Sequence, residues 1–127
     1  MSTEKIESWR DLLVWQKAHA AALEVYRQTK NFPPEERYHL TNQLRRAAVS
    51  VPTNIAEGKG RGSLAEFCQF LVIARGSIEE TRYLLLLAKD LGFLPMESST
   101  NVESLYTEIS KMTNALLRSP KTYPLRF

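Results

Sequence analysis

The side chains best suited to chemistry in this sequence lie between Gln43 and Arg61. Polar residues recur there in steps of three or four positions, which would place them along one face of a helix and its exit loop. They are short or planar hydrogen-bonding groups together with two arginines, and we call them the polar stripe: Gln43, Arg46, Ser50, Asn54, Glu57 and Arg61. A stripe of this composition predicts a groove in which the arginines face anions and the Asn54 amide recognises a partner.

The same stripe has a structural interpretation, which stays open at the level of sequence. A proline inside a helix removes a backbone hydrogen bond, and Ser50 and Asn54 lie on either side of Pro52, where they could satisfy the freed backbone. Glu57 and Arg61 are four positions apart, which is the spacing of an ion pair on a helix surface. On this interpretation the stripe stabilises the helix and binds no partner.

Positive charge is concentrated in the same part of the chain. The net charge is only +3, but between Arg37 and Arg61 five basic residues accompany a single acidic one, Glu57. Such a segment predicts contact with the phosphates of RNA or of a nucleoprotein. The side chains expected to make this contact are Arg45, Arg46, Lys59 and Arg61. The alternative is a solvated helix face that lacks acidic residues.

No catalytic or metal-binding pattern is complete. Glu36 and His39 have the Glu-x-x-His spacing of a di-iron bundle, but that site needs a second such motif and further inward glutamates. Cys68 is the single cysteine, which excludes an intramolecular disulfide and cysteine-based zinc or iron–sulfur sites. No motif supports a Cys–His dyad. The sequence therefore predicts a protein that is not an enzyme and that carries no metal or cofactor.

The elements that would position these side chains are four helices in a single domain spanning residues 1–127. Capping and stop signals delimit the helices at about 9–30, 34–57, 63–91 and 98–119, and a basic C-terminal tail follows at 120–127. Apolar residues continue in phase on both sides of Pro52, so we predict a kinked second helix rather than a broken one. Short connections between long helices predict an all-α, up-down-up-down four-helix bundle.

Two of the helices carry more apolar residues than one bundle can bury. The expected core face of the first helix is Leu12, Trp15, His19, Ala22, Leu23 and Tyr26. Further apolar residues lie outside that face, and the third helix adds Val72, Ile73 and the run from Leu84 to Leu87. A helix that is apolar nearly all round needs covering on more than one side. The sequence therefore predicts a homo-oligomer; the alternative is a large core with scattered surface leucines.

The sequence contains no signal for export or membrane insertion. It begins with the polar segment MSTEKIES and has no apolar run of the roughly 20 residues that a membrane span requires. We therefore expect a cytoplasmic protein that does not associate with a membrane.

Strings of residues along nearly the whole chain resemble a known family. They are Leu12-x-Val14-Trp15-Gln16-Lys17-Ala18, Phe32-Pro33-x-x-Glu36-x-Tyr38-x-Leu40-Thr41-x-Gln43-Leu44-Arg45-Arg46-Ala47, Ser50-Val51-Pro52-x-Asn54-Ile55-Ala56-Glu57-Gly58 with Gly60-Arg61, and Ile73-Ala74-x-Gly76-Ser77-x-Glu79-Glu80. Together these strings resemble the 23S rRNA intervening-sequence protein family.

This resemblance implies a four-helix bundle that assembles into a ring-like homopentamer. The family is also similar in fold to the accessory variability proteins of diversity-generating retroelements, which are basic pentamers that associate with nucleic acid and a reverse transcriptase. Its name reports where the genes lie, and likeness of fold does not transfer function. The expected role is therefore non-enzymatic: binding of RNA or a nucleoprotein through the basic patch, or alternatively an oligomeric protein-interaction scaffold with a structural polar stripe.

Overall fold

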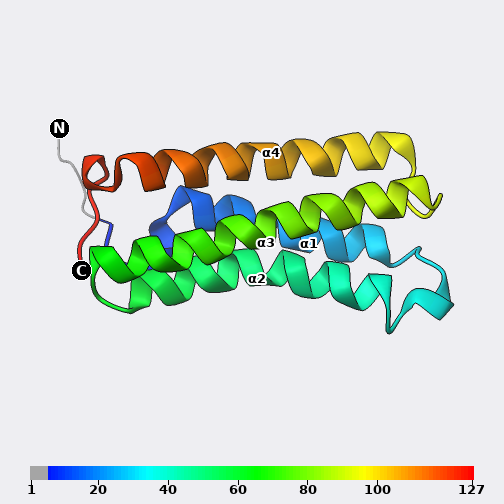
Figure 1. The fold of residues 1–127 in the computed structure, drawn as a ribbon, viewed down its shortest axis with the longest axis horizontal. Helices are drawn as coiled ribbons and strands as arrows, with labels where there is room; N and C mark the ends of the chain where they lie inside the picture. Colours follow the sequence, from blue (N-terminus) through cyan, green and yellow to red (C-terminus); the bar gives the residue numbers. More distant parts are fainter. Residues whose placement is uncertain (1–5) are drawn as a thin grey trace.

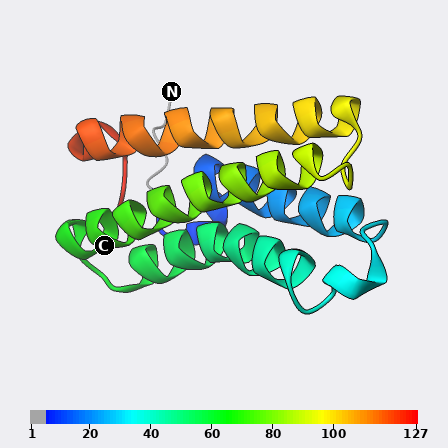
Figure 2. The same ribbon diagram turned by 45° about the vertical axis from the view of Figure 1, so that its right-hand side comes forward.

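The structure, a computed structural model, describes residues 6–127. Within that range the chain forms four long α-helices: α1 (Leu13–Thr29), α2 (Leu40–Gly60), α3 (Leu64–Asp90) and α4 (Met96–Arg118). Short 3-10 turns lie before, between and after them: η1 (Trp9–Asp11), η2 (Pro34–Glu36) and η3 (Pro120–Thr122). Successive helices run in opposite directions (Figures 1 and 2). The predicted all-α bundle of four helices is confirmed.

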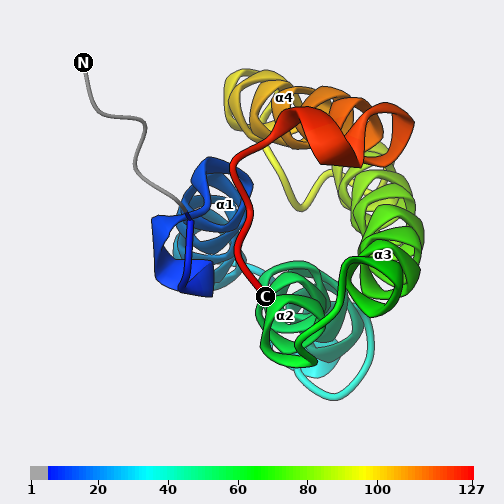
Figure 3. The ribbon, with the colours of Figure 1, turned by 90° about the vertical axis from the view of Figure 1, so that its left-hand side faces the viewer.

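The helices surround a common core in chain order, as the view along the bundle shows (Figure 3). Each helix contacts the next one in the chain, and α1 also contacts α4, which closes the bundle. The contact between α2 and α3 is the most extensive of these. Buried side chains from all four helices fill the core, among them Val25, Leu44, Phe67 and Tyr106. Helix α2 therefore lies between α1 and α3, and its outer face points away from α4.

The prediction for the first helix is wrong in its start, and of its predicted core face only Leu12 and Ala22 are buried. Ser8 caps the turn η1 by accepting a hydrogen bond from the backbone N–H of Arg10 at 3.2 Å, and α1 begins only at Leu13. The buried residues of α1 are Val14, Ala18, Ala21, Ala22, Val25 and Thr29. Trp15 is only half-buried, and His19, Leu23 and Tyr26 are exposed. Both series have helical spacing, but the small alanines allow α1 to lie closer to its neighbours.

The second helix buries the predicted face but starts and ends later than predicted. Pro34 opens the separate turn η2, and a non-helical backbone at His39 (φ −120°, ψ −107°) delays the start of α2 to Leu40. The helix then continues through Pro52 to Gly60; that Pro52 bends it stays a prediction. The apolar residues predicted for its core face are all buried: Leu40, Leu44, Ala47, Ala48, Val51 and Ile55.

The third and fourth helices begin and end within two residues of the predicted ranges. The hydroxyl of Ser63 accepts a hydrogen bond from the backbone N–H of Glu66 at 3.2 Å, as the predicted cap of α3 requires. At the other end Gly92 has a φ of +82°, a conformation that favours glycine after a helix. The leucine run is divided, because Leu84 and Leu85 are buried whereas Leu86 is exposed.

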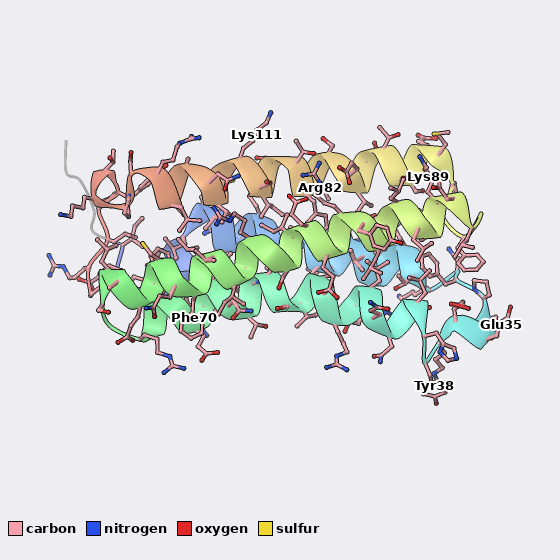
Figure 4. All side chains as sticks on the ribbon, in the orientation of Figure 1. Glu35, Tyr38, Phe70, Arg82, Lys89 and Lys111 are labelled. Carbon is pink, nitrogen blue, oxygen red and sulfur yellow. The ribbon has the colours of Figure 1, made fainter. Side chains whose placement is uncertain are left out.

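The close approach of α2 to α3 depends on Gly58. A Cβ atom at this position would lie 2.5 Å from the Cβ of Phe70 and 3.4 Å from the carbonyl oxygen of Phe67. Phe70 lies along the seam between the two helices (Figure 4). No residue larger than glycine fits here unless the helices move apart.

We expect Gly58→Ala to lower the free energy of unfolding by about 1–3 kcal/mol, because the added methyl group overpacks the seam. Urea denaturation followed by circular dichroism measures this change. The matched control is Gly60→Ala, since a Cβ at Gly60 would meet no other atom of residues 6–127 within 4 Å. The control is expected to leave the stability unchanged or to raise it by up to about 1 kcal/mol through helix propensity. Equal losses in both variants would contradict the assignment of Gly58 to helix packing.

Candidate functional site

The polar stripe lies along α2, beside a groove that α2 forms with α3. Gln43, Arg46, Glu57 and Arg61 are exposed, whereas Ser50 and Asn54 are half-buried. The groove has a volume of about 630 Å³, and its lining includes Tyr38, Gln43, Arg46, Ser50, Glu80 and Leu87. Tyr38 projects outward at the start of α2 (Figure 4). The members of the stripe thus lie along α2 and directly after its end, in different environments.

The middle of the stripe is occupied by hydrogen bonds within the chain. The amide of Asn54 donates to the carbonyl oxygen of Ser50 at 2.8 Å and to its hydroxyl at 2.9 Å. The Ser50 hydroxyl also lies 2.8 Å from the hydroxyl of Ser77 on α3. The contact with Ser77 joins the two helices and the contacts of Asn54 stay within α2, which favours the structural interpretation for Ser50 and Asn54. Their detail differs from the prediction, because the carbonyl that Pro52 leaves without its helical donor belongs to Ala48.

The end of the stripe carries an ion pair on the surface. The guanidinium of Arg61 lies 2.6 Å from the carboxylate of Glu57, and both side chains are about half exposed. The same guanidinium lies over the ring of Phe70, 5.0 Å from its centre. An exposed pair of this kind contributes little to stability, at most about 1 kcal/mol. Arg61 can therefore exchange Glu57 for another anion at small cost.

Arg45, predicted to contact phosphate, instead holds the end of α1. Its Nε donates to the hydroxyl of Thr29 at 2.8 Å, and an Nη donates to the carbonyl oxygen of Tyr26 at 3.5 Å. The guanidinium also lies 4.6 Å from the centre of the Tyr26 ring. A cation is stabilising at the C-terminal end of a helix, where carbonyl groups lack helical donors. The position of Arg45 thus has a structural explanation.

Lys59 is not placed to meet a phosphate, and the prediction for this residue is corrected. Only 5% of Lys59 is exposed. Its ammonium group donates to the carbonyl oxygens of Glu7 at 2.9 Å and Arg126 at 2.6 Å, and it lies 4.7 Å from the centre of the Phe127 ring. A long side chain on α2 therefore joins the two terminal segments. Nothing in the local sequence indicated this role, because its partners are 52 and 67 positions away.

The terminal segments that Lys59 joins also pair with each other. The backbone N–H of Ile6 donates to the carbonyl of Pro124 at 2.6 Å, and the N–H of Arg126 donates to the carbonyl of Ile6 at 2.8 Å. The C-terminal tail thereby crosses the end of the bundle from α4 to α2 (Figure 3). The ring of Phe127 then lies against the ring of Phe67, with their centres 5.9 Å apart.

Arg46 is the member of the predicted set whose charge has no partner in the described part of the chain. Its side chain is exposed and makes no hydrogen bond or ion pair with any part of the chain that the structure describes. Across the groove from it lies Glu80 on α3, which the predicted site did not include. Arg46 on α2 and Arg61 directly after its end are thus exposed, whereas the hydrogen bonds of Arg45 and Lys59 favour structural roles for these two residues.

The residues of the metal-site and Cys–His hypotheses can also be located in the structure. The carboxylate of Glu36 accepts a hydrogen bond from the backbone N–H of Leu40 at 3.4 Å, and His39 is exposed. Among residues 6–127 no group of three or more side chains is arranged to hold a metal ion. Cys68 is half-buried on α3. No helix in the described part of the chain is both long enough and apolar enough to cross a membrane.

Comparisons with known proteins agree with this architecture. The model of the family described as "23S rRNA-intervening sequence protein" matches residues 10–115. Among solved structures, the chain is similar to a protein of unknown function from the S23 ribosomal protein family of Bacteroides thetaiotaomicron, with 25% sequence identity and a TM-score of 0.74. That match covers 83% of this chain and 98% of the other. Comparison with curated proteins gives no match.

The role of Lys59 is testable by Lys59→Met, which keeps the length of the side chain and removes its donors. We expect the free energy of unfolding to fall by about 1–3 kcal/mol, because two carbonyl groups lose a charged partner. We also expect faster proteolytic cleavage of the C-terminal tail. Lys121→Met is the control, because Lys121 lies in the same tail and is exposed. If Lys59→Met has the same free energy of unfolding and the same rate of tail cleavage as the wild type, the role assigned to Lys59 is contradicted.

Proposed function

The chain belongs to the 23S rRNA-intervening sequence protein family, and from that premise we propose that it is a non-enzymatic bundle protein that assembles with copies of itself into a scaffold. The observation that carries the proposal is the uneven distribution of exposed apolar side chains over the bundle. On α1 and α2 they are Leu13, Leu23, Tyr26 and Val49; on α3 they are Val72, Ile73, Tyr83 and Leu86. Past its first residue, Met96, helix α4 has no large apolar side chain exposed in the described structure.

This uneven distribution of exposed apolar side chains supports self-association. Contiguous apolar patches on a folded protein mark sites of association, whereas single scattered residues need no explanation. Here exposed apolar residues lie on α1, α2 and α3, and Leu13 lies in an apolar groove that α1 forms with α4, whereas α4 itself exposes no large apolar residue past Met96 in the described structure. We propose a homopentamer, the state that the family resemblance implies, located in the cytoplasm as the sequence predicts.

The proposal is tested by the mass of the purified protein in solution. Light scattering at micromolar concentration is expected to give a particle of five times the 14.5 kDa chain mass. Dilution is expected to leave that mass unchanged over at least a tenfold range. A stable particle with the mass of one chain would overturn the scaffold proposal.

A second candidate function is binding of structured RNA by Arg46 and Arg61. It is favoured by the exposure of both side chains on the outer side of α2 and by the absence of an acidic partner for Arg46 within residues 6–127. Each phosphate contact releases counterions, so the affinity for RNA would fall steeply with added salt.

This candidate predicts that Arg46→Ala combined with Arg61→Ala weakens RNA binding. The slope of log affinity against log salt is expected to become shallower by roughly one for each phosphate that the variant no longer neutralises. Filter binding to a structured RNA at several salt concentrations measures both quantities. The control is Lys111→Ala combined with Arg118→Ala, which removes the same charge from exposed positions of α4. No RNA retention at low salt, or equal losses in both double variants, would leave the scaffold without an RNA-binding role.

A further inference from the structure

We propose that the groove between α2 and α3 holds an unpaired guanine base of RNA, with Glu80 accepting hydrogen bonds from its Watson–Crick edge and Arg46 donating to its O6 and N7 atoms. This inference rests on the second candidate function, binding of RNA. It adds to that function the base that is recognised and the side chains that recognise it. Of the two arginines of that candidate, Arg46 then contacts a base and Arg61 contacts phosphate.

The groove has the size and the lining that a flat base requires. Its volume of about 630 Å³ lies within the range of pockets that enclose small ligands. It follows α2 from Leu40 to Ser50, a length of about 15 Å at the rise of an α-helix. The two buried residues of its lining, Leu40 and Ala47, are apolar, and Leu87 is half-buried. An apolar bottom suits the face of a base, whose polar groups all lie at its edges.

Two opposite charges without ion-pair partners line this groove. Arg46 lies on α2 and Glu80 on α3, and both are exposed. Neither forms an ion pair, with the other or with any other residue of the described chain. The second carboxylate of the lining, that of Glu36, accepts a hydrogen bond from the backbone N–H of Leu40. Glu80 is therefore an acceptor, and Arg46 a donor, that the groove offers to a ligand.

The balance of charge in the groove disfavours a phosphate backbone as the occupant. The lining carries the carboxylates of Glu36 and Glu80 against the single guanidinium of Arg46. A phosphate chain laid along it would meet more negative than positive charge. Proteins that recognise RNA by sequence contact the edges of unpaired bases. An unpaired base inside the groove, with its phosphates outside, satisfies both conditions.

The pairing of a carboxylate with a guanidinium selects guanine among the four bases. An ionised carboxylate only accepts hydrogen bonds, and guanine has two neighbouring donors, N1–H and the N2 amino group, on its Watson–Crick edge. Its other edge presents O6 and N7, two acceptors that the fork of an arginine contacts together. Guanine therefore forms two bonds with Glu80 and two with Arg46, whereas each of the other bases forms fewer.

Tyr38 provides a surface for the base that follows in the strand. It lines the same groove, 77% of it is exposed, and its ring projects outward at the start of α2 (Figure 4). The guanidinium of Arg37 lies 5.6 Å from the centre of the ring. Exposed aromatic rings beside cationic side chains are platforms on which the bases of single strands stack. The groove thus combines recognition of one base with stacking of its neighbour.

The test uses a hairpin RNA whose loop holds one guanosine among uridines. In filter binding at low salt, replacement of that guanosine by adenosine is expected to weaken binding by about tenfold. Inosine, which lacks the N2 amino group, and 7-deazaguanosine, which lacks N7, are each expected to cause part of this loss. Equal affinity for the guanosine and adenosine hairpins would overturn the guanine assignment and leave RNA binding intact. No binding of any hairpin would overturn both.

Glu80→Gln tests the acceptor, because an amide of the same shape replaces the carboxylate. This variant is expected to bind the guanosine and inosine hairpins equally. The matched control is Glu79→Gln, since Glu79 is also exposed but pairs with Arg82 at 3.1 Å and does not line the groove. Both variants remove one negative charge, so any general effect of charge on RNA binding is shared. Unchanged discrimination in Glu80→Gln would contradict the assignment.

Arg46→Lys tests the donor, because lysine keeps the charge and lacks the fork. It is expected to lose discrimination between guanosine and 7-deazaguanosine while the salt dependence of binding stays at the wild-type value. Arg61→Lys is the control and is expected to keep the preference for guanosine. Full discrimination in Arg46→Lys would show that Arg46 does not read the base.

Guanosine monophosphate distinguishes a base within RNA from a free nucleotide. It is expected to displace the guanosine hairpin only at concentrations far above that of the hairpin, because the contacts of RNA with Tyr38 and Arg61 are missing. Free nucleotide that binds as tightly as the hairpin would overturn the role of this groove in RNA recognition.

Discussion

The packing of α2 against α3 is the constraint on which the rest of this bundle depends. The two helices approach so closely that a single methyl group at Gly58 would collide with Phe70. At the middle of the same seam the hydroxyls of Ser50 and Ser77 meet at 2.8 Å. Because α1 packs on α2, α4 packs on α3 and the two close the bundle, a shift of this seam would displace the groove and the polar stripe together.

Much of the positive charge that gives the sequence its basic segment is used to hold the bundle together. Arg45 completes the end of α1, and Lys59 joins the terminal segments through two carbonyl groups. A buried ammonium group is tolerated only with hydrogen-bond acceptors, and here backbone carbonyls provide them. A count of basic residues therefore overstates the charge available to a polyanion, and Arg46 and Arg61 are the members of the predicted set that still face outward.

The aromatic residues of α1 lie toward the surface, although their spacing is that of a core face. Trp15, His19 and Tyr26 recur with helical periodicity, yet the small residues one position away fill the core. This outcome leaves large apolar groups on the surface, beside Val49 and Pro52 of α2. The exposed apolar surface predicted from composition is therefore present: on α3 the predicted Val72, Ile73 and Leu86 are exposed, whereas on α1 residues predicted for the core contribute to it.

Local sequence signals were sufficient to predict the class of fold, the buried face of α2 and the extents of α3 and α4. Helix caps, glycines and apolar periodicity carry this information because each acts over a few neighbouring residues. Which of two apolar faces of α1 is buried depended on how closely α2 and α4 approach, which no local pattern encodes. The same holds for Lys59, whose partners Glu7 and Arg126 lie at opposite ends of the chain. Periodicity can place a residue on a face of a helix, but only the packed bundle decides what that face meets.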